Sequence, residues 1–144
     1  MDTIDYWQGL FLIVLIFGSA FFSASETALL SLSKIRLKHM VKENVKNARR
    51  IEKLLDDPNR LIGTILIGNN VVNIGASSIA TALAIKLYPN GGVGIATAIM
   101  TILVLIFGEV TPKNLALQHS EKFSLRITPI IDFLVKLLSP LVFV

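Results

Sequence analysis

Three long apolar runs dominate the chain and predict three membrane-spanning helices. The runs cover about residues 7–32, 61–87 and 93–110. A helix needs roughly 20 apolar residues to cross a bilayer, and these runs are of that order. A lone strand would leave its backbone polar groups without partners in lipid, so helices suit these segments. The pattern therefore predicts an all-α integral membrane protein.

A polar segment at about residues 34–58 separates the first two runs. Apolar positions recur in it at helical spacing, at Leu37, Val41, Val45, Ala48, Ile51 and Leu55. This spacing predicts one or two amphipathic helices that end at Asp57-Pro58. The turn "YPNGG" at residues 88–92 separates the second run from the third.

The distribution of charge predicts the orientation. Nine of the fourteen Lys and Arg residues lie between Lys34 and Arg60, whereas the opposite loop offers only Lys86. The positive-inside rule places this basic segment in the cytoplasm and the N-terminus and the 88–92 turn outside. This orientation explains the net charge of +4 better than a nucleic-acid partner does. We expect the basic helices to face solvent and membrane lipid headgroups.

The final segment, about residues 123–144, is apolar but carries a polar stripe at helical spacing, formed by Thr128, Asp132, Lys136 and Ser139. Such a stripe predicts an amphipathic juxtamembrane helix lying in the cytoplasmic interface, with a fourth span as the alternative. Because the chain stops inside the apolar run "SPLVFV", we expect residues 1–144 to be a single transmembrane domain of a longer protein.

Composition agrees with the membrane class and narrows the chemistry. Hydrophobic residues make up 53% of the 144, and only 17% are charged, where a soluble domain has about a quarter charged. The absence of cysteine excludes thiolate ligands, thiol nucleophiles and disulfides. His39 and His119 lie in the predicted cytoplasmic segments, so imidazole is not available at membrane depth.

Polar groups within the predicted spans converge at one depth. Ser23 shares a helical face with Ser19 and Glu26 on the first span, and Asn69, Asn73 and Ser77 share a face on the second. At about 1.5 Å per residue from the outer ends, Ser23, Asn73 and Glu109 lie roughly 24, 20 and 25 Å deep. Intramembrane polar groups are costly, so their convergence suggests a binding site.

The residue types in this cluster favour a hard cation. Amide oxygens, hydroxyls, a carboxylate and free carbonyls suit Mg²⁺, Ca²⁺, Na⁺ or Mn²⁺. Pro112 has no N–H to donate to the carbonyl of Gly108, four residues earlier, so that carbonyl is freed to face a cation. We expect Pro112 to break the helix there, as in the broken helices of transporters.

Structural roles compete with these assignments. Ser19 and Ser25 are expected to bond back to their own helix or to join two helices. Asn70 points away from Asn69 and Asn73 and either joins helices or supports the site. Glu26 could pair with the basic segment, and Glu109 could pair with Lys113 four residues later.

Three stretches resemble the transmembrane domain of the CorC/CNNM (cyclin-M) family: "FFSASETALLSLSKIRLK", "LIGNNVVNIGASSIAT" and "LIFGEVTPKNLAL". The resemblance covers essentially the whole chain, in order and with similar spacing. It implies a domain of three spans, with a cytoplasmic helical hairpin between the first two and a juxtamembrane helix after the third. It implies a homodimeric Mg²⁺ transporter in the plasma (inner) membrane, generally described as exporting Mg²⁺ in exchange for Na⁺. It also implies a cytoplasmic ATP-binding CBS-pair domain that follows the membrane domain in full-length members and is not in this chain.

The resemblance assigns roles residue by residue. It implies that Mg²⁺ is bound by Ser23, Asn69, Asn73, the Gly108 backbone and Glu109. Residues expected to support the site or Na⁺ coupling are Ser25, Glu26, Asn70, Ser77, Pro112 and Lys113.

We therefore expect Na⁺-coupled Mg²⁺ export by alternating access, with a partly or fully dehydrated ion held by oxygen ligands. The alternatives are a Mg²⁺-sensing membrane anchor for a cytoplasmic regulatory domain, and a channel or carrier for Na⁺ or another cation. An enzyme is the weakest interpretation, because Glu109 has no nucleophile or histidine at its depth.

Overall fold

The structure is a computed structural model that describes residues 3–142, and within that range it is helical without any strand. The elements are α1 (Thr3–Leu30), α2 (Lys34–Lys42), α3 (Ala48–Asp56), α4 (Pro58–Leu87), α5 (Gly92–Leu103), the π-helical segment η1 (Val104–Val110), α6 (Thr111–Gln118) and α7 (Ser120–Val142). Three helical stretches are long and apolar enough to cross a membrane: Asp5–Leu30, Pro58–Leu87 and Gly92–Gln118. The predicted all-α membrane fold is confirmed, and α7 is not among these three stretches.

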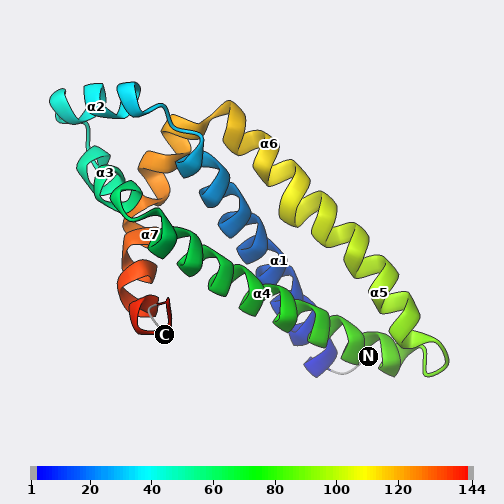
Figure 1. The fold of residues 1–144 in the computed structure, drawn as a ribbon. Coiled ribbons are helices and arrows are strands. Elements are labelled where there is room, and N and C mark those ends of the chain that lie inside the picture. Colours follow the sequence, from blue (N-terminus) through cyan, green and yellow to red (C-terminus); the bar gives the residue numbers. More distant parts are fainter. Residues whose placement is uncertain (1–2, 143–144) are drawn as a thin grey trace.

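The helices α1 and α4 run antiparallel and form the centre of the bundle (Figure 1). A Cβ added to Gly18 would lie 3.4 Å from Val72, so the two helices touch closely there. Where α1 begins and α4 ends, Lys86 Nζ lies 2.7 Å from Asp5 Oδ1. The start of α1 and the α4–α5 turn therefore lie at the same end of the molecule, as the predicted topology requires.

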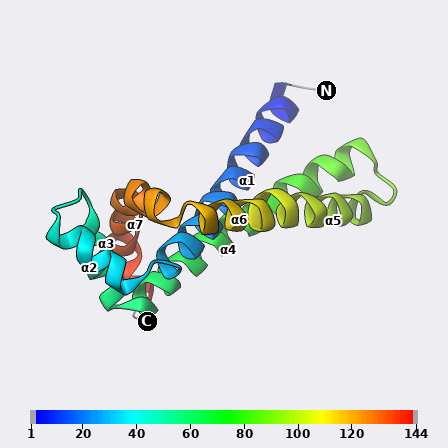
Figure 2. The ribbon, with the colours of Figure 1, turned by 90° about the horizontal axis from the view of Figure 1, so that it is seen from above.

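The third spanning rod, α5–η1–α6, returns along α1 and α4 (Figures 1 and 2). Its turn from α4 uses Gly91 at φ 83°, a left-handed conformation that favours glycine. The predicted turn at residues 88–92 is therefore present. The rod differs from the sequence prediction at its other end, because the helix passes Val110 and continues to Gln118.

Apart from the packing between the spanning helices, a second core lies at the end of the molecule opposite the α4–α5 turn. There the hairpin α2–α3 packs on α7 and on the adjacent ends of α1 and α4. Its buried members are Leu29, Leu37, Met40, Ala48, Ile51, Leu54, Leu61, Ile65, Ile127, Ile131 and Val135. Ser33 caps α2 and Asp57 caps α4, each accepting a hydrogen bond from a backbone N–H three residues later. The predicted boundary at Asp57-Pro58 is thus the end of α3, and α4 begins at Pro58 rather than at residue 61.

Polar contacts join the hairpin to α7. Arg36 donates two hydrogen bonds to the Glu121 carboxylate, at 3.1 and 3.0 Å, and Asn47 donates to the Leu125 carbonyl at 3.0 Å. The Arg36 guanidinium lowers the pKa of Glu121, chiefly through this hydrogen bonding. The hairpin is therefore tied to α7 as well as packed on it.

The polar residues predicted to form a stripe along α7 do not all face solvent. Thr128 is fully buried and donates to the Ser124 carbonyl, while Ser139 accepts a hydrogen bond from Arg60 of α4. The stripe lies beside the buried residues of the second core, so packing against α4 and the hairpin covers part of it. The helix also begins at Ser120, three residues before the predicted start.

Candidate metal centre

Ser19 of α1 contacts both other spanning rods, α4 through Asn69 and η1 through Gly108. The Ser19 hydroxyl on α1 donates a hydrogen bond to Asn69 Oδ1 on α4, with 3.2 Å between the oxygens. A Cβ added to Gly108 of η1 would lie 3.0 Å from the same Ser19 oxygen. Only a residue without a side chain fits there unless its neighbours shift, so Gly108 allows η1 to approach this contact.

Ser19 was not among the predicted ligands, although the structure places it at the centre of the predicted site. The prediction that it joins two helices is correct. Its buried hydroxyl also lies beside Asn69 and Gly108, both predicted ligands. The signal in the sequence was the spacing of Ser19 and Ser23, which share one helical face.

Ser23 and Asn73 flank this contact on opposite sides. Each lies four residues, or about 6 Å, along its helix from Ser19 or Asn69. Because α1 and α4 are antiparallel, Ser23 is displaced toward the hairpin and Asn73 toward the α4–α5 turn. Two ligands of one Mg²⁺ bound at about 2.1 Å lie within about 4 Å of each other. This arrangement therefore groups Asn69 and Gly108 around Ser19 and sets Ser23 and Asn73 apart.

Asn73 carries a buried oxygen that lacks a hydrogen-bond partner among the described residues, its side-chain Oδ1. Such a buried unpaired acceptor costs about 1–3 kcal/mol. A cation, or water bound to a cation, would satisfy it. Asn70 is exposed and faces away from Asn69, in agreement with the helical spacing.

The π-helical segment η1 changes the backbone hydrogen bonding around Gly108. The Thr111 N–H donates to the carbonyl of Ile106, five residues earlier, instead of to Phe107. Pro112 has no N–H for the carbonyl of Gly108. Two successive carbonyls, of Phe107 and Gly108, therefore lack their α-helical donor, and such π segments occur frequently at functional sites.

The expectation that Pro112 breaks the helix is wrong. The proline lies at the start of α6, and the rod continues to Gln118. The physical reason is that the wider π segment ends at Val110, so Pro112 falls in the first turn of α6, where its missing N–H is tolerated. A local change in hydrogen bonding thus accommodates the proline, which has no N–H, and the helix continues past it.

Glu109 is partly exposed and follows Gly108 in η1. The ion pairs within residues 3–142 are Arg36–Glu121, Lys86–Asp5 and Lys136–Asp132, so the alternative pairing of Glu109 with Lys113 is not formed. A carboxylate within a membrane span is costly without a cation or a proton. Glu109 is therefore the negative group available to a cation at this level.

The predicted supporting residues are dispersed. Ser25 is buried and donates to the Phe21 carbonyl of its own helix at 2.6 Å, the structural role expected for it. Glu26 lies one turn beyond Ser23 and, like Glu109, takes part in none of the ion pairs of the described chain. Ser77 and Lys113 are exposed. Over the same residues, three or more His, Asp or Glu never gather as a metal-binding group.

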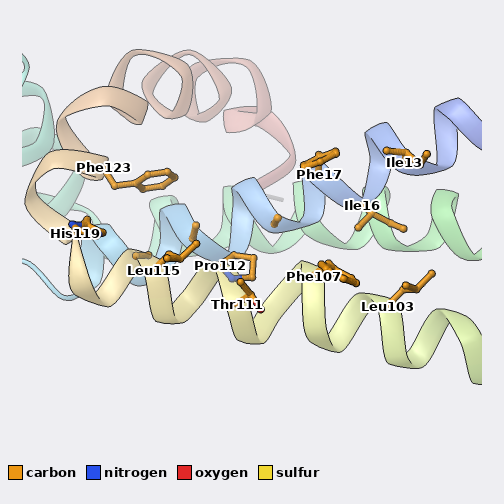
Figure 3. A pocket seen from close by; sticks show the side chains of 13 residues that line it. Ile13, Ile16, Phe17, Leu103, Phe107, Thr111, Pro112, Leu115, His119 and Phe123 are labelled. Atoms are coloured by element: carbon orange, nitrogen blue, oxygen red, sulfur yellow. The ribbon is translucent and has the colours of Figure 1, made fainter.

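An apolar cavity of about 700 Å³ lies on another side of the α5–η1–α6 rod (Figure 3). Its lining includes the aromatic rings of Phe17 of α1, Phe107 of η1 and Phe123 of α7, together with aliphatic side chains. Pro112 is also part of the lining. Its lining offers no set of oxygen ligands. Pro112 therefore acts at the candidate site only through its missing N–H.

Comparison with known proteins identifies relatives along nearly the whole chain. Residues 10–144 match the family described as cyclin M transmembrane N-terminal domain (CNNM). A UPF0053 protein of Haemophilus influenzae is 47% identical over 131 residues, covering 91% of this chain and 31% of that protein. The UPF0053 inner membrane protein YfjD of Escherichia coli is 50% identical over 104 residues, covering 72% of this chain and 24% of that protein.

A more distant relative bears a functional name. The polyamine export protein of Salmonella typhimurium is 30% identical over 141 residues, covering 89% of this chain and 32% of that protein. The chain thus spans about a quarter to a third of the length of these relatives.

Proposed function

The chain belongs to the cyclin M transmembrane domain family, and from this premise we propose that it carries Mg²⁺ across the membrane by alternating access, coupled to Na⁺. One observation carries the proposal. Oxygen-bearing groups of three spans meet at Ser19, Asn69 and Gly108. Next to them lies the Glu109 carboxylate, which forms no ion pair within residues 3–142. Oxygen ligands with one negative charge suit a small hard cation.

The proposed ligands have distinct tasks. Glu109 supplies the charge that compensates for water lost from Mg²⁺, which gives up its water reluctantly. Asn69 and the Gly108 carbonyl hold the ion at the level of Ser19. Ser23 is displaced toward the hairpin and would bind the ion before it reaches that level. Asn73 is displaced toward the α4–α5 turn and would bind the ion afterwards. Transport then requires α1 and α4 to shift relative to each other, and Na⁺ competing for these oxygens drives release.

The assembly and orientation complete the proposal. Under the positive-inside rule the α2–α3 hairpin and the C-terminus lie in the cytoplasm of a plasma (inner) membrane protein, and the α4–α5 turn lies outside. Two copies form a homodimer, and ATP acts only through a CBS-pair domain outside this chain. Ser25, Glu26, Asn70, Ser77 and Lys113 support the site rather than bind the ion, and the domain is not an enzyme.

Flux through proteoliposomes tests this function. Vesicles containing the purified chain and a Mg²⁺-sensitive dye should show Mg²⁺ movement that depends on an opposing Na⁺ gradient. Glu109→Gln should reduce the flux at least about tenfold, because it removes the only charged ligand. Glu43→Gln, an exposed carboxylate of the hairpin, is the matched control and should transport normally.

Each alternative function predicts a different combination of ion binding and ion flux. Mg²⁺ binding by calorimetry without flux would indicate a sensor. Flux of spermidine but not of Mg²⁺ would support the activity in the name of the polyamine export proteins. Wild-type Mg²⁺ flux in Glu109→Gln would overturn the site assignment.

A further inference from the structure

A second, polar cavity of about 270 Å³ lies between α4 and α5. Its polar wall is formed by Asn73, Ser77 and Thr81 of α4 and by Thr97 and Thr101 of α5. These residues recur every four positions, so each helix contributes a polar stripe facing the same space. Asn73 belongs both to this wall and to the candidate metal centre.

The cavity extends from the candidate centre toward the outer turn. Asn73 lies fifteen residues before Tyr88, or about 22 Å along α4, whereas Thr81 lies seven residues before it, or about 10 Å. On α5, Thr97 lies five residues after Gly92, or about 8 Å. The two stripes therefore line the outer half of the α4–α5 hairpin.

The hydroxyl groups of α5 present acceptor oxygens to this space. Thr97 Oγ1 donates to the Val93 carbonyl at 2.9 Å, and Thr101 Oγ1 donates to the Thr97 carbonyl at 2.7 Å. Because each hydroxyl has only one proton, its oxygen can only accept further hydrogen bonds. Acceptors favour a cation, or the water bound to one, over an anion.

The cavity has the size of a hydrated ion and lacks strong ligands. Six waters occupy about 180 Å³ at roughly 30 Å³ each, which is less than the cavity volume. Its lining contains neither a carboxylate nor a histidine. Neutral oxygens of this kind contact the water shell of Mg²⁺ without replacing it, which favours passage over storage.

We propose that this cavity is the outer vestibule of the transport path, through which a hydrated divalent cation moves between Asn73 and the external side. The inference rests on the proposed function and extends it, because it names the route and the hydration state of the ion. Asn73 Oδ1, which has no hydrogen-bond partner within residues 3–142, marks the inner end, where the ion exchanges water for protein oxygens.

Cysteine accessibility tests the vestibule directly, since the chain contains no cysteine of its own. Ser77→Cys and Thr97→Cys in proteoliposomes should react with a cationic, membrane-impermeant thiol reagent applied to the outer side. The matched controls are Ile74→Cys and Ile99→Cys, on the same helices and exposed at 67% and 52% but outside the cavity. The vestibule thiols should react at least about tenfold faster, because thiolate forms in water and not in lipid.

Two further measurements connect the vestibule to transport. Modification of Ser77→Cys should block Mg²⁺ flux, and millimolar Mg²⁺ should slow the modification. Equal reaction rates for Ser77→Cys and Ile74→Cys, or full flux after complete modification, would overturn the proposal. If the unmodified chain carries no Mg²⁺ at all, the proposed function fails, and the ratio of reaction rates still decides whether the cavity is a water-filled passage.

Discussion

The Ser19 hydroxyl on α1 donates a hydrogen bond to Asn69 Oδ1 on α4, and Gly108 of η1 lies against the same hydroxyl. One buried oxygen therefore touches all three spanning rods. A carbonyl oxygen has two lone pairs, so Asn69 can keep this bond while it also faces a cation. The contact is both a packing element and part of the proposed ion site.

Removal of the Ser19 hydroxyl should separate these two roles. Ser19→Ala removes the hydrogen-bond donor to the partly buried Asn69 oxygen, and we expect a loss of about 1 kcal/mol in stability. Mg²⁺ should recover part of that loss by binding the freed oxygen, which thermal unfolding in detergent with and without Mg²⁺ measures. Ser78→Ala, an exposed serine of α4, is the control and should change little. A Ser19→Ala variant as stable as wild type would show that the bond contributes nothing.

Gly108→Ala tests the close approach of η1 to α1. The new Cβ would lie 3.0 Å from Ser19 Oγ, tighter than ordinary packing allows, so either the Ser19 side chain or η1 must shift and the contact with Asn69 is disturbed. We expect a lower melting temperature and a loss of Mg²⁺ flux of about tenfold or more. Gly94→Ala has no neighbour within 4 Å of its added Cβ, so it should retain flux and gain up to about 1 kcal/mol.

Pro112→Ala tests the carbonyl of Gly108. The alanine supplies the missing N–H, and the chain can return from π to α hydrogen bonding around residue 108. We expect a more stable helix and a weaker transporter, because the carbonyl is no longer free. Flux and thermal stability measured on the same preparation decide the point; unchanged flux alongside higher stability would remove the Gly108 carbonyl from the site.

Asn73→Leu distinguishes an ion ligand from a structural residue. The Asn73 oxygen lacks a protein partner within the described chain, so its removal should leave stability unchanged or raise it by about 1 kcal/mol or more. Flux should nevertheless fall strongly. Asn70→Leu, on the neighbouring exposed position, should reduce flux less. Equal effects of the two substitutions on flux would argue against a specific role for Asn73.

The Arg36–Glu121 pair should make stability depend on acid pH. Arg36 lowers the pKa of Glu121 below its usual value of 4.5, so the carboxylate stabilises the fold above that value. This contribution is lost as pH falls through the lowered pKa, and it is small because both side chains are exposed. Unfolding of wild type and Glu121→Gln from pH 7 to pH 3 should therefore show curves that converge in acid. A constant difference over this range would contradict the assignment.

The pattern of apolar positions is enough to predict the spans, the amphipathic segment between the first two and the turn at residues 88–92. In a bilayer, apolar length and helical spacing are strong signals, because the backbone has few other ways to satisfy its polar groups. Helical spacing indicated Asn69, and the missing N–H of Pro112 indicated the Gly108 carbonyl; the structure brings both residues to Ser19. Helical spacing also separated Asn70 from Asn69, and the exposed Asn70 agrees.

The relative positions of the helices were decided only by the tertiary structure. Counting residues from the membrane surface put Ser23 and Asn73 at one depth, whereas the register of α1 against α4 places Ser19 opposite Asn69 and sets Ser23 and Asn73 to either side. The π turn before Pro112 and the partial burial of the α7 stripe were likewise not predicted. Both depend on contacts between residues far apart in the chain, and local periodicity carries no information about how far one helix slides along another.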